Sequence, residues 1–263
     1  MVAELVDQRP ELYRVEQDDA GRHNLRVSFH PGQLKAWDSR KRFVVVLAGS
    51  QGGKTSFGPF WLWREIQERG PGDYGVVTPT FPLLELKALP EFRRLFEETL
   101  NLGRYVGNPV RRFTVSAEGE IRLFGQRQRT PTHVYFGHAQ DPDSLESATF
   151  KGVWADEVGQ RKFQYGSWAA LRRRTTLHRA RVLFTTTPYV LGWLKTEFYD
   201  AWEATGRNHP TIDIINFAST MNPMFSEEEF EELRLSMPPW QFEMFHLGRF
   251  TRPAGLIYDC FSD

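Results

Sequence analysis

The segment from residue 42 to residue 63, RFVVVLAGSQGGKTSFGPFWLW, constrains the fold of this chain more than any other. It opens with an apolar, β-branched run at residues 43–47, which is typical of a buried strand. AGSQGGKT follows at residues 48–55, and then an aromatic-rich segment with helical spacing. A strand, a glycine loop, Lys-Thr and a helix in that order predict a phosphate site, because N–H groups of the loop and helix start would point at an anion.

Each residue type in this loop has an expected task. Lys54 is expected to reach the β- and γ-phosphate oxygens, and the Thr55 hydroxyl to bind Mg²⁺. Ala48 stands where the common pattern has glycine, but the tight turn at residues 52–53 is intact. The alternative is a glycine-rich turn with an exposed lysine, and the place of Gly-Lys-Thr between strand and helix argues against it. The backbone expected to hold the phosphates belongs to Gly49, Ser50, Gln51, Gly52 and Gly53.

Length and composition exclude several classes of protein. The 263 residues suffice for one large α/β domain, alone or with a small appendage. No run approaches the roughly 18 apolar residues of a membrane helix, and the N-terminus is too charged for a signal peptide, so no membrane association is expected. A single cysteine, Cys260, excludes an internal disulfide framework and favours a cytosolic protein. The net charge of zero gives no global attraction for polyanions.

The chain divides into three expected parts. Residues 1–28 are polar and irregular, and we expect a strapping arm there. Residues 29–248 form the α/β domain, with a small helical lobe over about residues 192–248 whose last two helices start after Ser226 and at Pro238-Pro239. Residues 249–263 are expected to be a linker.

Coarse periodicity places further elements. Residues 82–101 have the pattern of an amphipathic helix. Residues 110–136 alternate apolar and polar side chains, and residues 117–120 are expected to be a hairpin turn there. A short helix or turn is expected over residues 145–150.

A glutamine precedes the phosphate loop. Gln33 lies about twenty residues before Lys54. In many nucleic-acid motor ATPases a glutamine at that distance reads the adenine edge, because its amide offers both a donor and an acceptor. By itself a lone glutamine is weak evidence, and together with the loop it makes Gln33 a candidate nucleotide-binding residue.

Two adjacent carboxylates end a second apolar run, GVWADE at residues 152–157. In a strand successive side chains point to opposite sides, so Asp156 and Glu157 cannot do the same job. Asp156 can hold Mg²⁺ through its water shell, and Glu157 can orient and deprotonate an attacking water. The alternative is a charged strand end facing solvent, and the phosphate loop elsewhere in the chain favours the metal and base roles.

Two more clusters follow. Thr185, Thr186 and Thr187 end a predicted strand and either sense the γ-phosphate and pass on the nucleotide state or reflect strand propensity alone. A basic run that includes Arg172, Arg173 and Arg174 ends a predicted helix. It either supplies an arginine finger to a neighbouring subunit, contacts DNA, or is a solvated helix end stabilised by the helix dipole.

These elements together resemble the N-terminal ATPase domain of the large terminase subunits of tailed bacteriophages. The resemblance covers about residues 29–263 and lies in the order of HPGQ, AGSQGGKT, VVTPT, GVWADE, LFTTTPYVLGWLK and GRFTRPAGLIYDCF. The nucleotide motifs alone are shared with many motors, and the combination with TTTP and the last segment is more specific.

The resemblance implies a RecA-like (ASCE) P-loop α/β fold, a mostly parallel sheet flanked by helices, and ATP and Mg²⁺ as cofactors. It implies adenine reading by Gln33, phosphate and metal binding by Lys54 and Thr55, and a metal carboxylate and base at Asp156 and Glu157. Residues 185–187 would be the coupling motif.

The resemblance also implies partners and a setting. These are double-stranded DNA, the portal protein and procapsid, the small terminase subunit, and other copies of the chain in a ring, the isolated chain being a monomer. The expected location is the host cytoplasm. A nuclease domain would follow the motor, so we expect no nuclease activity from this chain alone.

This sequence departs from the terminase pattern at two places where an arginine would supply positive charge in the transition state. Many terminases have an arginine four residues before the loop lysine, where this chain has Ser50. Some relatives place a trans-acting arginine where Leu145-Glu146-Ser147 stands here. Both departures make the run at residues 172–174 the candidate source.

The sequence therefore predicts an ATP-driven motor that moves double-stranded viral DNA into a capsid. A helicase-like or repair translocase is the alternative among enzymes, but nothing after Gly248 supplies a second motor lobe. A nucleotide-binding assembly module with incidental hydrolysis is the alternative outside them.

Overall fold

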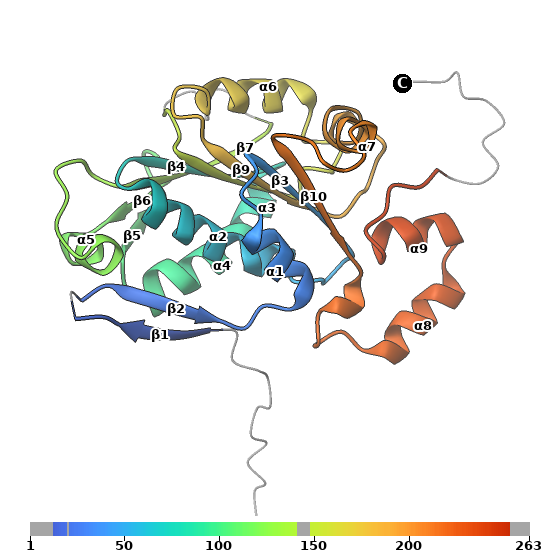
Figure 1. The fold of residues 1–263 in the computed structure, drawn as a ribbon, viewed down its shortest axis with the longest axis horizontal. Helices are drawn as coiled ribbons and strands as arrows, with labels where there is room; N and C mark the ends of the chain where they lie inside the picture. Colours follow the sequence, from blue (N-terminus) through green and yellow to red (C-terminus); the bar gives the residue numbers. More distant parts are fainter. Residues whose placement is uncertain (1–12, 20, 141–147, 253–263) are drawn as a thin grey trace, which may run out of the picture.

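A computed structural model describes residues 13–19, 21–140 and 148–252 of the chain (Figure 1). Its centre is an eight-stranded sheet with the order β10-β3-β9-β8-β4-β7-β6-β5. All neighbours from β10 to β7 are parallel, and β6 and β5 are antiparallel additions at one edge. The expectation of a mostly parallel α/β sheet is confirmed. The strands are β3 (Phe43–Ala48), β4 (Asp73–Thr78), β5 (Gly103–Val106), β6 (Arg112–Val115), β7 (His133–His138), β8 (Gly152–Asp156), β9 (Arg181–Thr186) and β10 (Ile212–Phe217).

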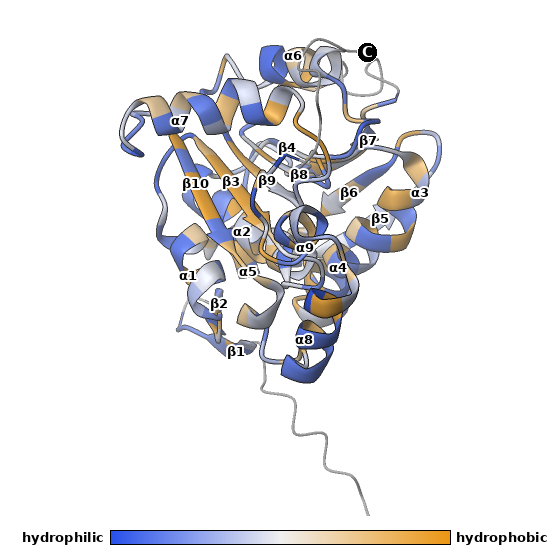
Figure 2. Cartoon of the chain, turned by 90° about the vertical axis from the view of Figure 1, so that its right-hand side faces the viewer, coloured by the Kyte–Doolittle hydropathy of each residue, from blue (hydrophilic) through white to orange (hydrophobic). Residues whose placement is uncertain are grey.

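Helices cover both faces of this sheet, and its apolar central strands lie between them (Figures 1 and 2). On one face α2 (Lys54–Arg69) buries Phe57 and Trp61 against the sheet. On the other, α6 (Tyr165–Arg174) and the helical stretch of η4 (Lys195–Tyr199) and α7 (Asp200–Ala204) bury Trp168 and Phe198. In the described part of the chain no helix is long and apolar enough to cross a membrane.

The expected amphipathic helix follows β4. It is continuous from residue 81 to residue 99 but alternates between α-helical and π-helical turns: α3 (Phe81–Leu83), η1 (Leu84–Ala88), α4 (Leu89–Arg93) and η2 (Arg94–Thr99). The six apolar residues that defined its pattern are all buried, namely Leu84, Leu89, Phe92, Leu95, Phe96 and Leu100. Apolar periodicity therefore identified the buried face correctly.

The segment after β6 was predicted wrongly. Residues 117–120 are not a hairpin turn but the start of a helix, α5 (Ala117–Phe124). The Ser116 hydroxyl caps it by accepting from the Gly119 N–H at 3.0 Å, and Gly125, at φ 76°, ends it. The cap signals at both ends outweigh the short alternation of apolar residues between them.

The helical lobe is smaller than expected. β10 pairs with β3 inside the main sheet and α7 packs against β10, so the stretch from residue 192 to residue 217 belongs to the sheet layers. The lobe consists of a short 3-10 turn, η5 (Ser219–Met221), and two helices, α8 (Glu227–Ser236) and α9 (Pro239–Phe245). The Ser226 hydroxyl accepts from the Glu229 N–H at 3.4 Å, as the capping signal predicted.

The N-terminal arm is more regular than the sequence indicated. β1 (Tyr13–Gln17) and β2 (His23–Val27) form an antiparallel hairpin beside α2. Tyr13 lies 5.3 Å from the Phe60 ring, centroid to centroid, and its hydroxyl is 2.7 Å from that of Thr99. These contacts attach the arm to helices distant in sequence. Residues 1–12, residues 145–147 of the expected short helix or turn over 145–150, and the linker from residue 253 lie outside the described residues. Residues 148–150, which are described, form neither a helix nor a turn.

Candidate active site

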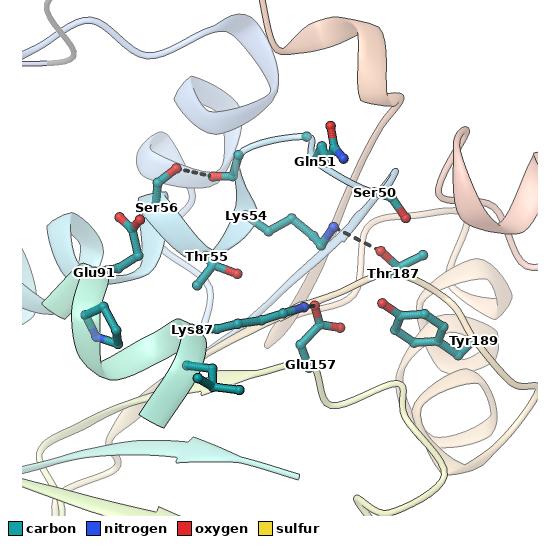
Figure 3. A pocket seen from close by; sticks show the side chains of 14 residues that line it. Ser50, Gln51, Lys54, Thr55, Ser56, Lys87, Glu91, Glu157, Thr187 and Tyr189 are labelled. Carbon is teal, nitrogen blue, oxygen red and sulfur yellow. Dashed lines mark hydrogen bonds and ion pairs between the residues drawn. The ribbon is translucent and has the colours of Figure 1, made fainter. Parts of the chain in front are cut away.

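A cavity of about 470 Å³ opens at the carboxyl end of the parallel strands (Figure 3). One wall is the glycine loop and the start of α2, residues 50–56, and the opposite wall is formed by η1 and α4. Glu157, Thr187 and Tyr189 complete the lining. The register of the parallel strands brings the ends of β3, β9 and β8 together, because Leu47 pairs with Thr186 and Thr185 with Asp156. Lys54, Asp156 and Thr186 therefore share one edge of the sheet.

Lys54 is almost fully buried beneath the loop. Its ammonium donates to the carbonyl oxygens of Ala48 and Gly49, at 3.2 and 2.8 Å, and to the Thr187 hydroxyl at 2.9 Å. Burial lowers the pKa of Lys54, and the charges of Glu157 and Asp156 oppose that shift. The ammonium is held by neutral oxygens that an anion in the cavity can replace.

Asp156 is fully buried at the end of β8 and accepts two hydroxyl hydrogen bonds. Thr55 Oγ1 is 3.0 Å from its Oδ2, and Thr185 Oγ1 is 2.7 Å from its Oδ1. Burial and then the charge of Glu157 raise the pKa of Asp156. The Thr55 hydroxyl and the Asp156 carboxylate are hard oxygen donors side by side, which is the chemistry that Mg²⁺ prefers. Both residues thus fit a magnesium site, while the described residues contain no cluster of three or more His, Cys, Asp or Glu side chains suited to a metal.

Glu157 reaches the cavity by a backbone turn rather than by strand alternation. β8 ends at Asp156, and Glu157 has φ 57°, in the left-handed region that non-glycine residues seldom adopt. Its N–H donates to the Thr185 carbonyl at 2.6 Å. Its Oε1 lies 3.5 Å from the Lys87 ammonium, and its buried Oε2 has no hydrogen-bond partner among the described residues. The two carboxylates are separated as predicted, but the backbone turn separates them rather than the alternation of a strand.

The three threonine hydroxyls each connect β9 to a different part of the site. Thr185 accepts from Trp154 Nε1 at 2.8 Å while donating to Asp156. Thr186 Oγ1 accepts from the Gly159 N–H at 2.9 Å, just after Glu157. Thr187 contacts the Lys54 ammonium and the Ala48 carbonyl. Strand propensity alone would not give each hydroxyl a separate partner in the site.

Two groups of predicted site residues do not face this cavity. Gln33 is 4 % exposed and lies behind the loop, where its Nε2 donates to the Gly53 carbonyl at 2.9 Å. The arginines at 172–174 end α6 at the amino edge of the sheet, where the Arg174 carbonyl accepts from the N–H of Phe150, two residues before β8. The structure therefore does not bring them to the cavity of their own chain.

A comparison with sequence profiles of protein families matches residues 45–262 to the family described as terminase large subunit, T4-like virus type, N-terminal. The chain belongs to this terminase large-subunit family. It is thereby a member of the ATPases that power DNA packaging in bacteriophages. A search of curated protein sequences finds no significant match.

Solved structures give the same fold. The ATPase domain of the large terminase of Thermus phage P74-26, as wild type and as a point mutant, has a TM-score of 0.68 at 21% identity, covering 86% of this chain and 95% of that one. The large terminase of another thermophilic bacteriophage has a TM-score of 0.70 at 18% identity, covering 89% and 57%. That second terminase has also been solved with ADP and with ATP-γ-S, with TM-scores of 0.64 to this chain at 16% identity, covering 84% and 53%.

Sequence reasoning missed four polar residues that line the cavity of this terminase, Ser56, Lys87, Glu91 and Tyr189. Lys87 lies on η1, where the pattern of apolar residues drew attention to the buried face instead. Tyr189 follows Thr187-Pro188 directly, so its position beside a strand end was a usable signal. Burial and then the charge of Glu157 raise the pKa of Tyr189 to about 12, so it stays a neutral hydroxyl. Ser50, where the resemblance led us to expect an arginine, lines the cavity.

Proposed function

We propose that this chain binds ATP with Mg²⁺ and hydrolyses it to move double-stranded viral DNA into a preformed capsid. The observation that carries the proposal is that the Lys54 ammonium and the Glu157 carboxylate face one cavity of about 470 Å³. Thr55 lines the same cavity and is hydrogen-bonded to Asp156. A phosphate-binding cation, hard oxygen donors and a carboxylate within one pocket are the parts that a nucleotide hydrolase requires.

The loop N–H groups of residues 49–55 bind the β-phosphate in this proposal. Lys54 exchanges its present acceptors, the carbonyls of Ala48 and Gly49, for phosphate oxygens. Its ammonium is already out of water, so little further desolvation accompanies that exchange. Thr187 keeps its hydroxyl on the lysine and orients it.

Thr55 and Asp156 would hold the Mg²⁺ ion. When bound, the ion neutralises charge on the β- and γ-phosphate oxygens. The Thr185 hydroxyl fixes the rotation of the Asp156 carboxylate, leaving Oδ2 on the side of Thr55. Burial disfavours the negative charge of Asp156, and a bound Mg²⁺ ion would compensate for that charge.

Glu157 acts as the general base. Its Oε2, buried and without a partner among the described residues, accepts a proton from the attacking water. Lys87 holds the other carboxylate oxygen and thus orients the group. Residues 185–187 couple the site to the fold, because their hydroxyls contact Asp156, the segment after Glu157 and Lys54.

The proposed setting is a ring of copies on the portal of a procapsid, in the host cytoplasm, with the small terminase subunit and double-stranded DNA as partners. An isolated subunit would be a monomer, and contacts within the ring would supply avidity that a neutral chain lacks. Residues 172–174 would act in trans, since they lie across the sheet from their own cavity.

The proposal is tested with Glu157→Gln, which keeps the size of the side chain and removes the base. We expect turnover of Mg-ATP to fall by about 10²- to 10⁴-fold with ATP affinity retained. Specific activity of the unaltered chain should rise with protein concentration if a neighbour completes the site. Tight ATP binding without turnover at any concentration would favour a nucleotide-dependent assembly module instead.

A further inference from the structure

The HPGQ segment, residues 30–33, lies directly behind the phosphate loop and contacts it through two side chains. His30 Nε2 is 3.1 Å from the Gly52 carbonyl oxygen, and Gln33 Nε2 donates to the Gly53 carbonyl at 2.9 Å. Two successive carbonyls of the loop are therefore held from the same short segment. Neither His30 nor Gln33 lines the cavity.

His30 uses both ring nitrogens. Its Nδ1 caps α1 (Pro31–Asp38) by accepting from the N–H groups of Gly32 and Gln33, at 3.1 and 3.3 Å. A nitrogen that accepts must carry a lone pair, so in the neutral ring the proton is on Nε2 and is donated to Gly52. The ring thus connects the start of α1 to the loop.

The segment packs so closely against the end of β10 that no side chain fits at Gly32. The Phe217 ring, at the end of β10, lies 4.9 Å from the His30 ring, centroid to centroid. A Cβ added to Gly32 would lie 2.4 Å from Phe217, and one on Gly53 would lie 2.9 Å from the Gln33 amide nitrogen. The position of the segment relative to the loop is therefore fixed by packing as well as by hydrogen bonds.

Holding these carbonyls determines where the loop N–H groups point. In a planar trans peptide the C=O and the following N–H point in opposite directions. The His30 contact holds the Gly52 carbonyl toward α1. The Gly53 carbonyl accepts from Gln33 and also from Ser56 Oγ at 3.0 Å and the Phe57 N–H at 3.3 Å, so Gln33 adds to a direction that the start of α2 already favours. The N–H groups of Gly53 and Lys54 point away from these carbonyls, on the side of the cavity that both residues line. Donors that are already directed at an anion bind it without a further cost of ordering.

We propose that His30 and Gln33 are positioning residues that pre-orient the phosphate loop, and that Gln33 does not select adenine. This inference rests on the proposed ATP site and changes the role that the sequence suggested for Gln33. It follows that both side chains strengthen the binding of any polyphosphate, whichever base it carries.

The test compares dissociation constants for ATP, GTP and inorganic tripolyphosphate by calorimetry, with Mg²⁺ present. Gln33→Ala should weaken all three by a similar factor, roughly tenfold for one lost hydrogen bond. His30→Asn should do the same, because asparagine can still cap α1 but is too short to reach Gly52. Lys35→Ala, on an exposed position of the same helix, is the matched control and should change none of the three.

The outcomes separate this inference from the proposed function. If Gln33→Ala weakened the affinity for ATP alone and left the affinities for GTP and tripolyphosphate unchanged, Gln33 would be a base reader and the inference would be overturned. Unchanged affinities in both variants would overturn it as well. If the unaltered chain bound none of the three probes, the proposed ATP site itself would be disproved. Melting temperatures identify a variant that has merely unfolded. Gln33→Ala and His30→Asn remove different contacts, so both are not expected to unfold for the same reason.

Discussion

Thr185 is the residue on which the geometry of the Asp156 carboxylate depends. Among the described residues its hydroxyl is the hydrogen-bond partner of both Trp154 Nε1 and Asp156 Oδ1. Thr185→Val keeps the shape and removes the partner of Trp154 Nε1 and of Asp156 Oδ1, while Thr55 still donates to Asp156 Oδ2, so we expect about 1–3 kcal/mol less stability in urea denaturation. Thr185→Ser restores the hydroxyl and should recover most of the loss. Equal stability of the valine variant and the unaltered chain would show that neither group depends on this hydroxyl.

Protonation of His30 makes the stability of the folded chain depend on pH. Burial lowers the pKa of His30 from 6.5, and its bond to the Gly52 carbonyl only partly opposes this. The folded chain therefore binds fewer protons at this site than the unfolded chain, and the contribution of His30 to stability is lost as the pH falls below about 6.5. The raised pKa of Asp156 acts in the opposite direction, so the effect of His30 is read from the difference between the unaltered chain and its variant. Burial also lowers the pKa values of His23, His133 and His246, so His30→Asn should reduce this loss without abolishing it. Urea denaturation at pH 7.5 and 5.5 measures it, and identical losses in the two proteins would contradict the prediction.

At the scale of single residues the sequence predicted that Lys54, Thr55 and Glu157 lie at one cavity, but it also assigned Gln33 and residues 172–174 to the site, and these do not line that cavity. Lys54, Thr55 and Asp156 follow from strand ends that a parallel sheet must bring together. The turn that directs Glu157 and the contact between Gln33 and Gly53 depend on packing between distant segments, and no local pattern records them. Lys87 was missed because a helix pattern indicates a buried face and says nothing of the residues beside it.

At the scale of elements a buried ion pair ties α2 to β9. The Arg181 guanidinium donates to the Glu65 carboxylate, and Arg69 Nε is 2.9 Å from the same group. Glu65 is fully buried and Arg181 nearly so. Arg181 is therefore a structural residue, although in sequence it adjoins the basic run.

Removing one partner of this pair should be costly. Glu65→Ala leaves the Arg181 charge buried without its carboxylate, so we expect a loss of about 3–5 kcal/mol in the free energy of unfolding. The control is Arg40→Ala, which breaks a surface pair with Glu68 and should cost at most about 1 kcal/mol. Chemical denaturation measures both changes, and similar losses in the two variants would show that burial does not decide the effect.

Elements were predictable where the signal was local and strong. α2 follows from its glycine loop at one end and Gly70 at the other, and β3 from an uninterrupted apolar run. α5 was missed because three apolar residues at short spacing suit a strand and a helix equally. The hairpin of β1 and β2 was missed because most of its side chains are exposed and none is fully buried, so only a weak apolar pattern marks its strands.

At the scale of the whole molecule the phosphate loop and the arginine run lie on opposite edges of the sheet. The loop is at the carboxyl ends of the strands. The arginines at 172–174 are at the amino ends, where the Thr175 carbonyl accepts from Arg42, the residue before β3. A single chain therefore cannot use these arginines at its own cavity in this arrangement. If they take part in hydrolysis, they do so at the cavity of another copy.

This separation predicts complementation between two inactive proteins. A variant with Arg172, Arg173 and Arg174 all changed to alanine retains its own cavity, and Glu157→Gln retains its arginines. Mixed at high concentration, the two should recover part of the ATPase activity, because some interfaces combine an intact cavity with intact arginines. Lys54→Ala mixed with Glu157→Gln is the control and should stay inactive, since both changes damage the cavity of their own chain. Full activity of the triple alanine variant alone would exclude these arginines from catalysis and leave Lys54 and Lys87 as the cations of the described cavity.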